Sequence, residues 1–91
     1  TAALRPLALV TGASAGLGAE FCRQLAARGH DLVMVARRGE RLAALARELA
    51  TRHGVAAWPV PIDLGEADAI ARLLTMLPDA PVARLINNAG Y

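Results

Sequence analysis

The 91-residue sequence contains no lysine and one cysteine, and aromatic side chains make up only 3% of it. Ten arginines and eight acidic residues give a net charge of +2. This charge is too small and too dispersed to indicate a nucleic-acid-binding surface, so we expect no nucleic-acid partner. The longest apolar runs are about five residues, against the roughly 20 that cross a bilayer, so we predict neither a membrane span nor a signal peptide.

The few cysteine and histidine residues do not indicate a reactive or metal-binding centre. Cys22 lies between Phe21 and Leu25 in an apolar helical pattern, and one cysteine cannot form an internal disulfide. We therefore predict a buried, inert thiol in a reducing, cytoplasmic setting. His30 and His53 adjoin glycines that end helical patterns, and neither has a metal-ligating residue at suitable spacing. We expect both histidines in exposed loops and no metal site.

Hydrophobic residues, mostly alanine and leucine, make up 55% of the chain, enough for one modest core in one domain. Short apolar runs alternate with segments whose apolar residues have helical spacing. The runs predict strands at residues 7–10, 32–35, 56–62 and from 84, and the helical patterns begin near residues 16, 42 and 66. This alternation predicts right-handed crossovers and a parallel sheet covered on both faces.

The predicted third helix should have a charged start and an apolar face. We expect Glu66 and Asp68 in its first turn and Pro78 as its end. Its apolar face would consist of Ile70, Leu73, Leu74 and Leu77.

Two prolines restrict the position of the third strand. Pro59 and Pro61 would each remove a hydrogen bond from a central strand. Because residues i and i+2 direct their backbone nitrogens to the same side, both prolines can face solvent at the edge of a sheet. We therefore predict that this strand lies at an edge.

A glycine-rich turn separates the first strand from the first helix. Its glycines, Gly12, Gly16 and Gly18, have the spacing Gly-x-x-x-Gly-x-Gly. Glycine permits positive φ and close backbone approach to a pyrophosphate, and free N–H groups at a helix start favour an anion. The turn therefore predicts phosphate binding, with purely structural turn glycines as the alternative.

Two segments resemble the short-chain dehydrogenase/reductase family letter for letter: Thr11-Gly12-Ala13-Ser14-Ala15-Gly16-Leu17-Gly18 and Asn87-Asn88-Ala89-Gly90. Asp63-Leu64 stands where the family has its Asp after the third strand. The resemblance implies an α/β fold with a Rossmann-type doubly wound parallel sheet, whose first four strands have the order 3-2-1-4 and are joined by three helices. That order agrees with the edge position predicted from the prolines.

The resemblance also implies a dinucleotide site. Its cofactor-binding residues would be Gly12, Ser14, Ala15, Gly16, Leu17, Gly18, Asp63, Leu64, Asn88, Ala89 and Gly90. Asp63 would accept from the adenine amino group, with a helix N-cap as its alternative role. Asn88 would face the cofactor, and Asn87 would brace the sheet.

The end of the second strand predicts the choice of dinucleotide. NAD sites usually place an acid there for the ribose 2′-hydroxyl, but this sequence reads Ala36-Arg37-Arg38. Arg37 and Arg38 could form charge-assisted hydrogen bonds with a 2′-phosphate, so NADP(H) is favoured over NAD(H). The alternative is a solvated, charged helix start.

The family's catalytic Ser, Tyr and Lys would lie beyond the Asn-Asn-Ala-Gly segment. The chain has no lysine, and its one tyrosine is Tyr91, so we assign no catalytic residue. We interpret residues 1–91 as the amino-terminal part of a single Rossmann domain, truncated after the fourth strand. The whole protein would be an NADP(H)-dependent oxidoreductase of carbonyl or alcohol substrates, forming a homo-oligomer through its absent half. The alternative is a non-catalytic, truncated nucleotide-binding module.

Overall fold

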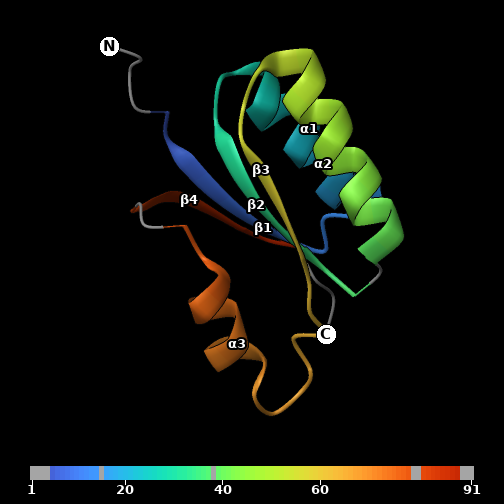
Figure 1. Cartoon of the computed structure of the whole chain (residues 1–91), viewed down its shortest axis with the longest axis vertical. Helices are drawn as coiled ribbons and strands as arrows, with labels where there is room; N and C mark the ends of the chain where they lie inside the picture. Colours follow the sequence, from blue (N-terminus) through green and yellow to red (C-terminus); the bar gives the residue numbers. More distant parts are fainter. Residues whose placement is uncertain (1–4, 15, 38, 79–80, 89–91) are drawn as a thin grey trace.

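The structure, a computed structural model, describes residues 5–14, 16–37, 39–78 and 81–88. Strands and helices alternate along this part of the chain (Figure 1). In chain order they are β1 (Leu7–Thr11), α1 (Gly16–Ala27), β2 (Asp31–Ala36), α2 (Gly39–His53), β3 (Ala57–Pro61), α3 (Ala69–Met76) and β4 (Val82–Asn87). The predicted alternation is confirmed.

The described strands form one parallel sheet in the order β3-β2-β1-β4. This Rossmann-like order is the predicted one, and it places β3 at an edge. The backbone nitrogen of Leu32 donates to the carbonyl of Ala56 at 2.9 Å. Because alternate residues of a parallel strand face the same neighbour, Trp58 and Val60 also turn their backbones toward β2. Pro59 and Pro61 therefore lie on the open side, where their missing N–H groups interrupt no ladder.

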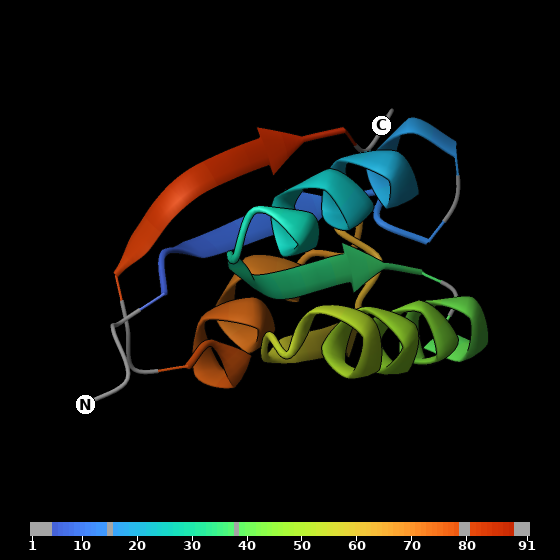
Figure 2. The ribbon, with the colours of Figure 1, turned by 90° about the horizontal axis from the view of Figure 1, so that it is seen from above.

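Alternating side chains of the central strands supply two separate cores. Ala8, Val10, Leu32 and Met34 pack with α1 and α2 on one face of the sheet. Leu7, Val33 and Val35 pack with α3 on the other face. Figures 1 and 2 show the resulting layers, with α1 and α2 on one side of the sheet and α3 on the other. None of the described helices has the length and hydropathy needed to span a bilayer.

The third helix begins later than the sequence predicts. Glu66 lies in a series of turns before α3, and Asp68 is the N-cap residue rather than part of the first turn. The predicted apolar face is also partly wrong, because Ile70 and Leu74 are 61% and 64% exposed. Ala69 and Leu73 are the residues of α3 that are buried against the sheet. The end is as predicted, since Leu77 before Pro78 is extended, with φ −74° and ψ 142°.

His30 is buried, so its predicted exposed position is wrong. Gly29, with φ +85°, ends α1, and the His30 nitrogen donates back to the Leu25 carbonyl at 3.0 Å. This turn brings the His30 side chain inward, where it is 8% exposed and accepts at Nε2 from Nε of Arg84 at 3.2 Å. Arg84 follows an irregularity in the β1–β4 register, a feature that commonly redirects side chains. His53 is the last residue of α2 and is partly buried, so its predicted position in an exposed loop is also wrong, because α2 continues up to Gly54.

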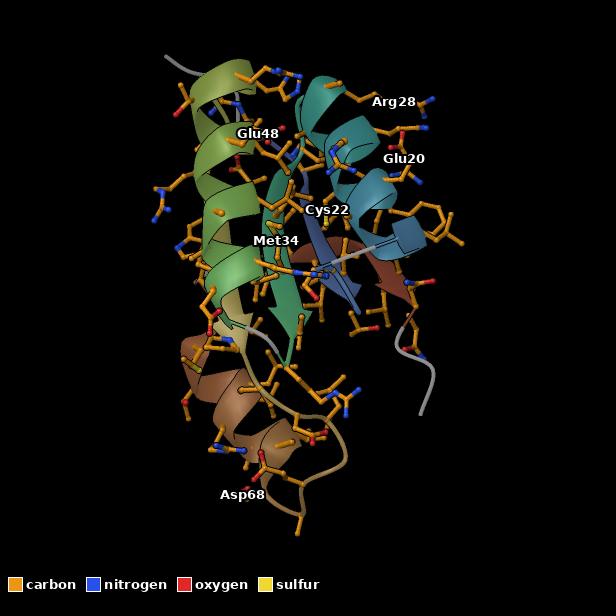
Figure 3. The ribbon with its side chains drawn as sticks, turned by 90° about the vertical axis from the view of Figure 1, so that its right-hand side faces the viewer. Glu20, Cys22, Arg28, Met34, Glu48 and Asp68 are labelled. Carbon is orange, nitrogen blue, oxygen red and sulfur yellow. The ribbon has the colours of Figure 1, made fainter. Side chains whose placement is uncertain are left out.

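Cys22 is fully buried, as predicted, on the α1 side of the sheet near Met34 (Figure 3). Burial raises the pKa of the Cys22 thiol to about 12, and the nearby charge of Arg23 offsets this only in part. The thiol therefore stays protonated at neutral pH, which makes it a poor nucleophile.

Candidate cofactor-binding site

The predicted site residues follow the carboxyl ends of the described strands (Figure 1). The glycine turn follows β1, Arg37 follows β2, Asp63 lies just beyond β3, and Asn88 follows β4. Because the strands are parallel, these ends share one edge of the sheet, where ligands of open α/β sheets bind.

The glycine turn depends on backbone angles that other residues rarely adopt. Gly12 has φ +63° and Gly16 has φ +59°. Between them, the nitrogen of Ala13 donates to the carbonyl of Val35 at 3.1 Å, which ties the turn to the end of β2. The turn is therefore held against the sheet by its backbone.

Gly18 lies where the first turn of α1 approaches both the glycine turn and β4. A Cβ atom at Gly18 would collide with the carbonyl oxygen of Gly12 and lie 2.9 Å from Nδ2 of Asn88. The missing side chain thus permits the first turn of α1, the glycine turn and the Asn88 side chain to meet at the edge of the sheet. Close packing of the helix on the turn is the role of the last glycine in a dinucleotide-binding turn, so these residues fit a dinucleotide.

A hydroxyl group connects the glycine turn with the end of β4. Oγ1 of Thr11 donates to Oδ1 of Asn87 at 3.0 Å and accepts from the backbone nitrogen of Asn88 at 2.9 Å. Thr11 is 5% exposed. Asn87 therefore braces the sheet, as expected, while Asn88 has its amide group beside Gly18. The role of Thr11 was not predicted from the sequence, although Thr11 ends a buried strand and two asparagines stand at the end of β4.

The end of β2 is followed by the basic Arg37, and the nearest acidic side chain in the sequence, Glu40, lies in the first turn of α2. Ala36 is the last residue of β2 and is buried, whereas Arg37 is exposed. Gly39 begins α2 so close to β3 that an added Cβ would lie 3.3 Å from Cβ of Pro61. The start of α2 is therefore packed against the strand that leads to Asp63.

Asp63 organises the segment after β3 and does not cap α3. Its Oδ1 accepts from the nitrogen of Gly65 at 2.9 Å, and its carbonyl accepts from the nitrogen of Glu66 at 3.0 Å. Because α3 begins at Ala69, the alternative N-cap role of Asp63 is wrong. Leu64 is partly buried against the core on the α3 side.

The structure thus brings Gly12, Gly18 and Asn88 into contact and places Arg37 and Asp63 on the neighbouring strand ends. Ser14 is partly buried in the turn, and Leu17, at the start of α1, is 61% exposed. The remaining predicted residues, Ala15, Arg38, Ala89 and Gly90, lie outside the described residues.

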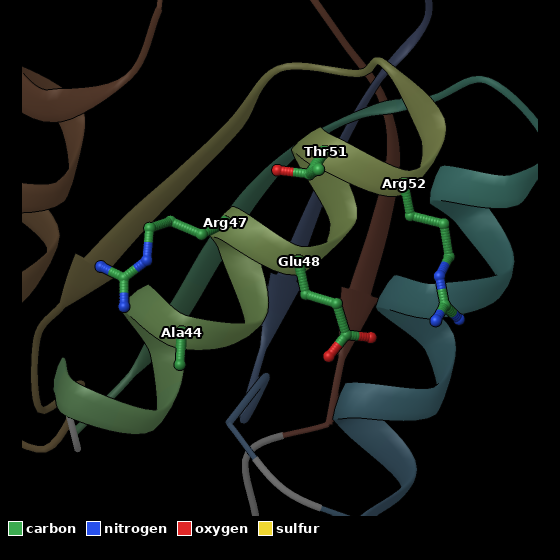
Figure 4. Close-up of a pocket in the computed structure, with 5 residues that line it drawn as sticks. All are labelled: Ala44, Arg47, Glu48, Thr51 and Arg52. Atoms are coloured by element: carbon green, nitrogen blue, oxygen red, sulfur yellow. The ribbon is translucent and has the colours of Figure 1, made fainter.

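A shallow hollow occurs elsewhere, on the outer surface of α2 (Figure 4). Its lining residues are Ala44, Arg47, Glu48, Thr51 and Arg52. All of them come from one helix and none from a strand end, so the hollow is separate from the candidate site. The described residues contain no group of three or more His, Cys, Asp or Glu side chains that could hold a metal ion.

Comparison with known proteins gives the family. Residues 6–91 match the family model for short chain dehydrogenase. The chain belongs to the short-chain dehydrogenase family. This family of oxidoreductases accounts for the Rossmann-like sheet and for the glycine turn at the end of β1.

Similar proteins include a probable NADP-dependent dehydrogenase of Dichelobacter nodosus, 42% identical over 92% of this chain and 77% of the relative. A very-long-chain 3-oxoacyl-CoA reductase of Candida glabrata is 38% identical over 91% of this chain and 24% of the relative. A solved short-chain dehydrogenase of Sphingobium yanoikuyae, in complex with NADPH, has a TM-score of 0.86 and 45% identity, over 93% of this chain and 34% of that one. The chain thus spans about a quarter to three quarters of these proteins.

Proposed function

We propose that this chain forms the NADP(H)-binding part of an oxidoreductase that transfers hydride between nicotinamide and a carbonyl or alcohol substrate. The site residues would be those of the glycine turn, Arg37 and Arg38 after β2, Asp63 and Leu64 after β3, and Asn88 to Gly90 after β4. Bound NADPH would supply the hydride, and the chain would bind and orient the dinucleotide.

The glycine turn between β1 and α1 is the observation that carries this proposal. Positive φ at Gly12 and Gly16 directs the turn toward the start of α1, whose free N–H groups favour a phosphate. The absence of a Cβ at Gly18 lets α1 pack directly on Gly12, beside the amide of Asn88. These positions support a phosphate-binding turn at the end of β1.

The arginine corner, which is Arg37 and Arg38 after β2, supports the choice of NADP(H) over NAD(H). Ala36 occupies the end of β2, where an acid would bind the ribose 2′-hydroxyl, and the exposed Arg37 follows it. A guanidinium group can bind a 2′-phosphate through charge-assisted hydrogen bonds. The NADPH-bound Sphingobium neighbour and the name of the Dichelobacter relative support the same choice.

We assign cofactor binding, and no acid–base step, to these residues. The chain has no lysine and a single tyrosine, Tyr91. We also infer, from the order of the family motifs along the sequence, that residues 1–91 belong to the amino-terminal part of one dinucleotide-binding domain. In support, 93% of this chain matches only 34% of the Sphingobium structure. The cytoplasmic location and the homo-oligomer stay predictions.

Titration with NADPH and NADH, followed by nicotinamide fluorescence, tests the cofactor proposal. We expect saturable binding of both, with NADPH at least about tenfold tighter because of the 2′-phosphate contacts. Absence of saturable binding would refute dinucleotide binding, and tighter binding of NADH would refute the NADP(H) preference. NADPH consumption by the full-length protein that contains this chain, in the presence of aldehydes and ketones, then separates an oxidoreductase from a non-catalytic binding module.

A further inference from the structure

Arg72, in the second turn of α3, holds two acidic residues that precede the helix. Its Nη2 lies 3.1 Å from Oε1 of Glu66, and its Nε lies 3.3 Å from Oδ1 of Asp68. Both acids belong to residues 63–68, the segment that joins Asp63 to α3. The guanidinium group thus connects the body of the helix with the segment after β3. In Figure 3, Asp68 marks the position where this segment meets α3.

The other hydrogen bonds of this segment are local. Asp63 accepts from Gly65 and Glu66, and the carbonyl of Glu66 accepts from the nitrogen of Ala69. Asp68 is the N-cap residue, but its side chain makes no capping hydrogen bond to the start of α3. Leu64 packs against the core, and the backbone nitrogen of Arg72 donates to the carbonyl of Asp68 at 3.0 Å. The two ion pairs of the Arg72 side chain add a second link, and among the described residues they alone join the side chains of Glu66 and Asp68 to the body of α3.

The segment determines how Asp63 is presented at the edge of the sheet. Because Gly65 already occupies one lone pair of Oδ1 of Asp63, Oδ2 has the greater capacity to accept from a ligand. The backbone conformation of residues 63–66 sets the direction of that oxygen. A change in this conformation would turn the carboxylate away without altering any residue at the edge.

We propose that Arg72 is a positioning residue for the adenine side of the cofactor site. It holds residues 63–68 in the conformation that directs the Asp63 carboxylate toward the adenine ring. This role rests on the proposed function, because it requires a dinucleotide at the strand ends. Arg72 itself touches no part of the cofactor and acts through Glu66 and Asp68.

The expected effect is moderate, because the ion pairs are partly exposed. The side chains of Arg72, Glu66 and Asp68 are 44%, 54% and 68% exposed, and single ion pairs at such positions contribute little. Losing both pairs should lower the fraction of molecules whose segment is ready to bind. Apparent affinity falls with that fraction, so we expect NADPH binding to weaken about three- to tenfold.

The test compares Arg72→Gln with Arg47→Gln, a control that removes the same charge from an exposed arginine of α2. Amide hydrogen exchange at Gly65 and Glu66 is measured without cofactor, and NADPH affinity is measured in parallel. We expect Arg72→Gln to accelerate this exchange about threefold or more and to weaken NADPH binding. Arg47→Gln should change neither quantity.

A double substitution separates positioning from a general loss of stability. With Asp63→Asn as the background, adding Arg72→Gln should weaken NADPH binding much less than it does alone, because both changes affect the same contact. Arg72→Lys should restore part of the affinity, since one ammonium group can hold one acid at a time.

Three results would overturn the proposal. Unchanged exchange in Arg72→Gln would show that Arg72 does not order the segment, and faster exchange with unchanged NADPH affinity would show that this order does not serve the cofactor. If Arg72→Gln weakened NADPH binding equally with and without Asp63→Asn, Arg72 would not act through Asp63. If the unsubstituted protein bound no NADPH, the proposed function and the positioning role would both fail. Amide exchange would still show whether the ion pairs of Arg72 order residues 63–68.

Discussion

His30 and Arg84 form a hydrogen bond of 3.2 Å that joins the turn after α1 to the edge strand β4. Since Nε2 of His30 accepts this bond, the proton of the neutral ring lies on Nδ1. Nδ1 is buried and has no hydrogen-bond partner within the described part of the chain. Among the described residues, the hydrogen bond from Arg84 to Nε2 is therefore the one that the His30 ring makes.

Replacing Arg84 with Met should lower stability, because it leaves Nε2 of the buried ring without a donor. We expect a loss of about 1 kcal/mol in the free energy of unfolding, measured with urea. Arg47→Met, which removes an exposed arginine from the outer surface of α2, is the matched control and should have little effect. Equal stabilities of the two variants would contradict a stabilising role for the bond.

Thr11→Val should weaken both the fold and the site. Valine has the shape of threonine but leaves the nitrogen of the partly buried Asn88 without its partner, at a cost of about 1 kcal/mol. Oδ1 of the exposed Asn87 can bond to water instead. Because Asn88 lies beside Gly18, NADPH affinity should fall as well. Thr11→Ser keeps the hydroxyl and should retain most of the affinity. Urea unfolding and NADPH titration of both variants check this, and equal behaviour of valine and serine would count against the contact.

Gly18→Ala should abolish the close approach of α1 to the glycine turn. Its methyl group would collide with the carbonyl of Gly12, so we expect NADPH binding to weaken about tenfold or more. Gly29→Ala is a useful comparison, because Gly29 also requires glycine, by its φ of +85°, but has open space around its Cβ position. That variant should lose about 1–2 kcal/mol of stability and keep its NADPH affinity. Titration of both variants with NADPH, at a temperature where each is folded, distinguishes a weakened cofactor site from a loss of stability.

The buried thiol of Cys22 should make the protein less stable in alkaline solution. Its pKa rises from 9.0 to about 12 because burial disfavours the thiolate. The unfolded chain then releases this proton at lower pH than the folded one. The stability that the protonated thiol contributes to the folded state is fully present below pH 9. It is lost between pH 9 and 12, by up to about 1.4 kcal/mol per pH unit. Urea unfolding across this range should show a steeper decline for the unsubstituted protein than for Cys22→Ala, and parallel declines would contradict the prediction.

The sequence was most informative where one physical rule determines the outcome. Pro59 and Pro61 predicted an edge strand because neither can donate a ladder hydrogen bond, and β3 lies at the edge. The glycine spacing predicted the turn after β1, because Gly12 and Gly16 supply the positive φ values that it needs.

Positions that depend on long-range packing were not predictable in this way. His30 is buried because Gly29 turns the chain inward and Arg84 approaches from β4, 54 residues further along. The predicted start of α3 was wrong because the carbonyls of Asp63 and Glu66 accept hydrogen bonds in successive turns before Ala69. Helical periodicity of the sequence does not reveal such turns. Thr11 gains its role only when β4 is placed beside β1.

The most direct test of the account is the NADPH affinity of Arg37→Ala, compared with its NADH affinity. If the arginine corner binds the 2′-phosphate, NADPH binding should weaken about tenfold or more while NADH binding hardly changes. Arg52→Ala, at the far end of α2, removes the same charge and should leave both affinities unchanged. Equal losses for NADPH and NADH in Arg37→Ala would contradict the proposed NADP(H) site.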